Sequence, residues 1–60
     1  MMTEQEFTPK NFKAYAQALM QAGTEEQLAF ELTVEHFAVN WSDKEALDLA
    51  EKWFLDITKK

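Results

Sequence analysis

Apolar side chains recur at helical spacing in three stretches of the chain, separated by short polar breaks. In the first stretch they follow the i, i+3, i+4, i+7, i+8 rule of an amphipathic helix, at Phe12, Tyr15, Ala16, Leu19 and Met20. In the third they cover one broad face, at Ala46, Leu47, Leu49, Ala50, Trp53, Phe54 and Ile57. The pattern predicts an all-α protein with three short helices, at about 9–22, 25–40 and 43–58, joined by tight turns.

Residue types at the ends of these stretches predict where each helix begins and ends. Thr8 suits a helix cap, Pro9 suits the first helical position, and Gly23 is typical of a helix stop. A capping box has Thr or Ser followed by Gln or Glu three residues later. Two such boxes, at 24–27 and 42–45, predict that Thr and Ser cap the second and third helices.

The middle stretch, 24–41, is apolar on two sides when it is wound as a helix. Leu28, Leu32 and Val39 lie on one side, and a second group lies nearly opposite: Phe30, Val34, Phe37 and Trp41. An amphipathic helix on a protein surface needs only one apolar stripe. A helix with two apolar stripes should therefore pack against neighbours on both sides. One side meets the first and third helices, and the other has no partner left in the chain. We therefore predict a helical bundle completed by homodimerisation, with the second group as the oligomer interface.

Two other interpretations of this stretch stay open. Apolar residues from Leu28 to Val34 occupy every second position, which is also typical of a half-buried strand that would pair across a dimer. The preceding capping box favours the helix. Alternatively, both apolar sides are used within one chain, with the middle helix wedged between its neighbours.

The length of the chain limits what it can bury. Sixty residues make one domain, 1–60, of which the polar segment 1–6 is expected to be frayed. A chain this short buries roughly 60% of the surface that its unfolded form exposes. From Phe7 onward, eighteen residues are large and apolar, so a self-association surface is the natural place for the surplus. Leu55 alone points to the polar side of the third helix. A single exposed Leu is normal on a protein surface, and the alternative interpretation is a second contact.

The charge is acidic and unevenly distributed. Eleven acids against six lysines give a net charge of −5, and arginine is absent. This balance argues against direct nucleic-acid binding, which needs basic patches. There is no apolar run of membrane-spanning length near the start, so we expect a soluble, cytoplasmic protein. The whole surplus of acids lies between 23 and 43, where Glu25, Glu26, Glu31 and Glu35 form a candidate partner-binding acidic face. Its simpler interpretation is a solvated face that keeps the protein soluble.

Candidate chemistry is sparse. His36 is the only histidine, and a catalytic base needs a nucleophile within reach. Ser42, the only serine, is already explained as a helix cap. Glu31 and Glu35 lie near His36 in sequence, but the Glu-x-x-His step of di-iron bundles is missing because Thr33 occupies the Glu position. We predict no catalytic residue, no cofactor and no metal site.

The predicted function is therefore binding rather than catalysis. We expect a small regulatory or accessory protein that binds itself and an unidentified protein partner of basic character. Its size and composition are typical of the products of small phage or bacterial accessory genes. The alternative is a nucleic-acid mimic that occupies the basic site of a nucleic-acid-binding protein. A DNA-binding helix-turn-helix is disfavoured because its recognition helix would begin with acids facing phosphates, at 43–45.

Overall fold

The computed structural model of the chain describes residues 6–59. It contains three helices, α1 (Pro9–Gln21), α2 (Glu26–His36) and α3 (Lys44–Thr58), and no strand within those residues. The predicted all-α, three-helix fold is confirmed, and the strand interpretation of the middle stretch is wrong. The expected fraying of 1–6 falls almost entirely on residues outside the described part. At its edge, the Glu6 carbonyl accepts hydrogen bonds from the Thr8 backbone (2.9 Å) and the Asn11 side chain (3.0 Å).

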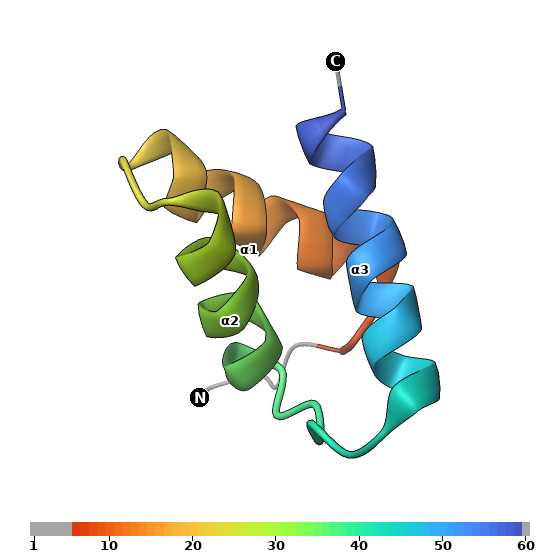
Figure 1. The fold of residues 1–60 in the computed structure, drawn as a ribbon. Helices are drawn as coiled ribbons and strands as arrows, with labels where there is room; N and C mark the ends of the chain where they lie inside the picture. Colours follow the sequence, from red (N-terminus) through yellow and green to blue (C-terminus); the bar gives the residue numbers. More distant parts are fainter. Residues whose placement is uncertain (1–5, 60) are drawn as a thin grey trace, which may run out of the picture.

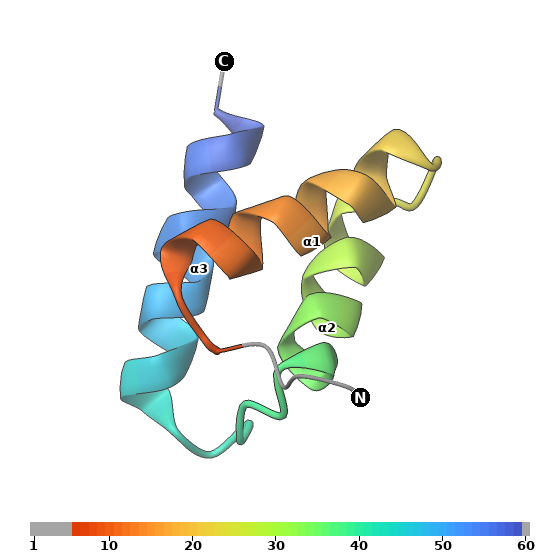
Figure 2. The ribbon, with the colours of Figure 1, turned by 180° about the vertical axis from the view of Figure 1, so that it is seen from behind.

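The three helices form two layers. α2 and α3 run in opposite directions beside each other, and the 37–43 loop crosses the gap between them at one end (Figure 1). α1 crosses behind this pair and contacts both helices, as the reverse view shows (Figure 2). The side of the α2–α3 pair opposite α1 is covered by no other described helix (Figures 1 and 2). No helix in the described part is both long and apolar enough to cross a membrane.

α1 has the boundaries that its sequence predicts. The Thr8 hydroxyl accepts a hydrogen bond from the Asn11 backbone N–H at 3.2 Å, and Pro9 occupies the first helical position. At the other end Gly23 has a φ of 102°, and its N–H donates to the Met20 carbonyl at 3.0 Å. This is a Schellman closure, in which a left-handed residue lets the chain satisfy the last carbonyls of the helix.

The starts of α2 and α3 differ from the prediction by one residue. Thr24 does not cap α2, because its N–H donates to the Leu19 carbonyl (3.0 Å) and so closes α1 instead. The α2 cap is Glu25, which makes no side-chain capping bond. α3 is capped by Asp43, whose carboxylate accepts from the Ala46 N–H at 3.2 Å, and not by Ser42. The two capping boxes therefore located the turns correctly but not the cap residues.

α2 is also shorter at its C-terminal end than predicted. It ends at His36 because Ala38 adopts a φ of 57°, the left-handed conformation usually reserved for glycine. The Ala38 and Val39 N–H groups then donate to the carbonyls of Glu35 (3.0 Å) and Val34 (3.1 Å), which is a second Schellman closure. Phe37 keeps its hydrogen bond to the Thr33 carbonyl (3.1 Å), but residues from 38 onward leave the helix, and a helical wheel no longer describes where they point.

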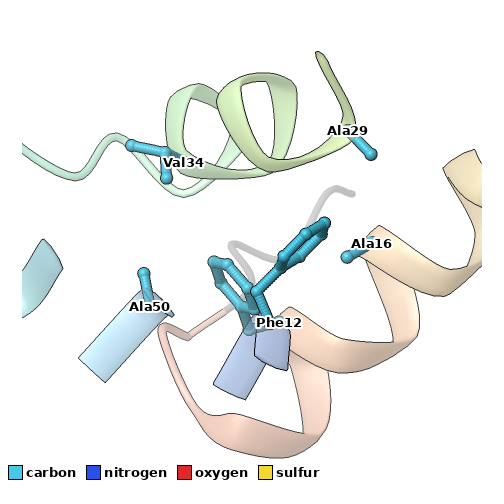
Figure 3. Packing of buried hydrophobic residues seen from close by; sticks show 6 residues of the cluster. Phe12, Ala16, Ala29, Val34 and Ala50 are labelled. Atoms are coloured by element: carbon cyan, nitrogen blue, oxygen red, sulfur yellow. The ribbon is translucent and has the colours of Figure 1, made fainter. Parts of the chain in front are cut away.

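The core forms where the three helices meet. Its centre is Phe12 of α1, which has no exposed surface, and small residues of each helix lie around it, as Figure 3 shows for Ala16, Ala29 and Ala50. Four aromatic rings have their centroids about 6 Å from that of Phe12: Phe7 (6.0 Å), Phe37 (6.0 Å), Trp53 (5.9 Å) and Phe30 (6.3 Å). Small residues allow backbones to approach, and the rings fill the remaining space.

Candidate protein-docking groove

The two apolar sides of α2 are placed opposite to expectation. Val34 is fully buried inside the chain, and Phe30 and Phe37 pack against the core. Leu28 and Leu32, expected to face the other helices, are instead 47% and 38% exposed. Aromatic rings bury more apolar area than leucines, roughly 150–250 Å² each, so the side with the rings gains more from facing inward.

This reversal bears on the predicted oligomer interface, from which it removes Val34. Three of its four residues, Phe30, Val34 and Phe37, contribute to the chain's own core, and Val34 has no surface left for a second copy. Trp41 is the exception, because it lies in the α2–α3 loop with 49% of its surface exposed. Self-association stays a prediction, and so does the part of Phe30 and Phe37 in it, because both are only partly buried.

An apolar groove lies between α2 and α3. It encloses about 290 Å³ and is lined by two residues of α2 and three of α3: Gln27, Phe30, Glu51, Phe54 and Leu55. Because α2 and α3 run in opposite directions, the groove lies between the first turns of α2 and the last turns of α3. These parts of α2 and α3 lie away from the connecting loop (Figure 1).

The floor of the groove is aromatic and continuous with the core. The rings of Phe30 and Phe54 meet edge to face, with centroids 5.4 Å apart and planes at 69°. Behind them Phe30 contacts Phe12, the buried centre of the molecule. The floor is therefore held in place by the packing of the folded core, as a preformed binding surface requires.

Apolar side chains remain exposed at this groove. Leu55, which lines it, is 62% exposed and is the most exposed of the large apolar side chains in the described part of the chain. The Trp41 ring lies 6.4 Å from the Phe30 ring, so it adds apolar surface next to the floor on the side of the connecting loop. The lone Leu on the polar side of the third helix was thus the sequence signal for this surface. No equivalent signal pointed to Gln27 or Glu51.

The rim of the groove is acidic. Glu51 is exposed there and is one turn before Leu55 on α3. On α2, Glu31 is exposed and lies one turn beyond Gln27 on the same side of the helix. Within residues 6–59 the ion pair found is Lys13–Asp56, at 3.1 Å on the α1–α3 side, so neither rim carboxylate is neutralised by a described lysine.

The predicted acidic face is exposed but is not gathered into one site. Glu25 caps α2, Glu26 lies in its first turn and Glu35 in its last, so the set spreads along roughly 15 Å of helix axis. All four glutamates, including Glu31, are exposed. By helical spacing Glu31 lies one turn beyond the groove residue Gln27, whereas Glu35 lies further round α2, toward the side of Leu28 and Leu32.

His36 and Ser42, the residues considered for catalysis, contact other parts of the chain in the described interactions. The His36 ring stacks on Tyr15 of α1, with centroids 3.9 Å apart and planes at 13°. The Ser42 N–H donates to the Asn40 side chain at 2.8 Å in the α2–α3 loop. Among residues 6–59 no three His, Cys, Asp or Glu side chains are grouped as metal ligands would be.

Comparison of the chain with models of known protein families, with curated proteins and with solved structures gave no match. The groove is therefore interpreted from its own geometry and chemistry.

Proposed function

We propose that this chain is a non-enzymatic protein-interaction protein whose binding site is the groove between α2 and α3. The observation that supports this best is the combination of a fixed aromatic floor, formed by Phe30 and Phe54, with the highly exposed Leu55 beside it. A contiguous apolar surface rimmed by polar residues is typical of a site where another protein docks.

The size of the groove favours a protein side chain over a free metabolite. Its volume of about 290 Å³ falls at the lower limit of small-molecule sites, which span roughly 300–1,000 Å³. A groove between helices instead takes one or two apolar anchors from a partner protein, and the rest of that partner covers the rim.

Two other functions are less well supported. A nucleic-acid mimic would use the exposed carboxylates of α2, but it has no need for an apolar groove beside them. Homodimerisation remains a proposal for the outer side of α2, where Leu28 and Leu32 are exposed. Light scattering at micromolar concentration measures it, and variants of these leucines show whether that side is the contact.

Site-specific photocrosslinking in the cells that naturally express the protein tests the groove directly. A benzophenone amino acid replaces Leu55 in the groove or, as the matched control, Leu49, which is 44% exposed on α3 but does not line the groove. We expect one discrete protein partner to be crosslinked from position 55 and not from position 49. Equal crosslinking from both positions, or none from position 55, contradicts the proposal.

A further inference from the structure

We propose that the groove binds an amphipathic helix of a partner protein, with apolar residues on one face and lysine or arginine at its flanks. This inference rests on the proposed function and specifies the partner's chemistry.

The architecture favours a helix as the occupant. α1 packs across one side of the α2–α3 pair, and the opposite side is left open (Figures 1 and 2). A helix laid in the groove on that side would complete a four-helix arrangement. A peptide strand has nothing to pair with, because strand addition needs a sheet edge and residues 6–59 contain no strand.

The charge favours a basic partner over a second copy of the chain. α2 carries three glutamates and no lysine, and α3 carries four carboxylates against two lysines. Two copies that met through these helices would bring like charges together at the rim of a contact. A partner with basic residues flanking its apolar anchors would instead meet Glu51 and Glu31, which no described lysine neutralises.

Together the floor and the rim determine how such a helix binds. One apolar side chain enters between Phe30 and Leu55, and a second, one turn away, covers Trp41, because helix-in-groove partners present anchors at i, i+3, i+4 and i+7. The apolar contacts supply most of the affinity. The rim carboxylates supply orientation and a faster association that salt weakens.

The probe for this proposal is a labelled peptide of leucine and lysine, about 14 residues or four turns long, with its leucines at helical spacing. Two control peptides separate its properties. One has the same composition in an order that scatters the leucines around the helix, and the other keeps the spacing but replaces lysine with glutamate. Fluorescence anisotropy with the full chain should show binding of the first peptide, and binding weaker by at least about tenfold for each control.

Matched variants connect that binding to the groove. Leu55→Glu should weaken it by at least about tenfold, whereas Leu49→Glu should change it by less than about twofold. Glu51→Lys should weaken binding by about three- to tenfold, and Glu45→Lys, which makes the same change in net charge away from the groove, should have a smaller effect. Thermal melts by circular dichroism confirm that each variant is folded.

The outcomes distinguish this inference from the proposed function. If Leu49→Glu weakens the leucine–lysine peptide as much as Leu55→Glu does, the groove is not its site and the inference is overturned. The same conclusion follows if the glutamate peptide binds as tightly, or if no peptide binds. In each of these cases a discrete partner crosslinked from position 55 would leave the proposed function standing with a partner of other chemistry.

Discussion

Two regions of the molecule are built from the same kinds of residue but differ in how completely their apolar side chains are buried. One is the side where α1 packs, and the other is the seam between α2 and α3. Where α1 meets the other helices, Phe12 and Ala16 are fully buried, and Lys13 and Asp56 close the edge with an ion pair. Between α2 and α3, Phe30 and Phe54 also meet, yet a groove of about 290 Å³ stays open beside them with Leu55 exposed.

The difference comes from which side chains face each other. α1 presents a small residue, Ala16, next to its one large core ring, so its backbone approaches the neighbouring helices closely. Between α2 and α3 a bulky ring from each helix, Phe30 and Phe54, meets the other edge to face, and the groove lies beside the two rings. This seam therefore exposes apolar surface in the folded chain, which a binding site requires.

Removal of the central ring should have the largest effect on the closed side. Phe12→Ala deletes a fully buried aromatic side chain, which typically costs about 3–5 kcal/mol of unfolding free energy. That is comparable to the total stability expected for a chain of this length, roughly 3–9 kcal/mol. We expect the variant to be largely unfolded at 25 °C by far-ultraviolet circular dichroism. A cooperative melt close to that of the unchanged protein would mean that α1 does not organise the core.

Overpacking tests how tightly α1 fits. Ala16→Leu adds bulk where Ala16 has no exposed surface, so we expect a loss of about 1–3 kcal/mol in urea unfolding. Ala18→Leu is the matched control, because Ala18 is exposed on the same helix and should change stability by less than about 0.5 kcal/mol. Similar values for the two variants would show that the α1 interface has room to spare.

α1 and α2 are each followed by a residue in the left-handed backbone conformation, Gly23 and Ala38, and the two can be compared by substitution. Gly23→Ala should cost about 1 kcal/mol, because no atom lies near the added carbon but the φ of 102° strains any other residue. Ala38→Gly should gain about 0.5–1 kcal/mol by relieving the same strain at a φ of 57°. Thermal unfolding measures both changes, and a loss of stability on Ala38→Gly would contradict the assigned end of α2.

The smallest effect on stability is expected at the open seam. Leu55→Ser should change the unfolding free energy by less than about 0.5 kcal/mol, because the Leu55 side chain is mostly in water. Urea unfolding at neutral pH measures it. A loss of about 2 kcal/mol or more would mean that Leu55 packs inside the chain and that the seam is closed in solution.

The sequence predicted the number, type and order of the helices, and the whole of α1, because a cap, a proline, a regular apolar stripe and a glycine stop agree there. It did not predict where α2 ends. No glycine marks that point, and Ala38 takes a conformation that alanine rarely adopts. With the helix drawn too long, Trp41 was projected onto a helical face although it lies in the loop, whereas Phe37 at the helix end packs on the same side as Phe30 and Val34.

The candidate site was predicted only in part. Helical periodicity finds apolar stripes, but it does not say which of two stripes faces the core, so Phe30 and Val34 were placed outside and Leu28 inside. The bulk of the aromatic rings is the signal that favours the observed side. Leu55 was marked as out of place by the sequence alone. Its pairing with Gln27 and Phe30 across the groove depends on the angle between α2 and α3, which local patterns do not encode.

The measurement that tests the open seam most directly is a nuclear magnetic resonance titration of the isotope-labelled chain with the leucine–lysine peptide. The account predicts that the largest shift changes map to the groove: the amides of Gln27, Phe30, Glu51 and Leu55, together with the Trp41 indole. Amides on the outer side of α2 around Leu28, and those of α1 away from the core, should change little. Shifts centred on α1 or on Leu28 and Leu32, with the groove unchanged, would contradict it.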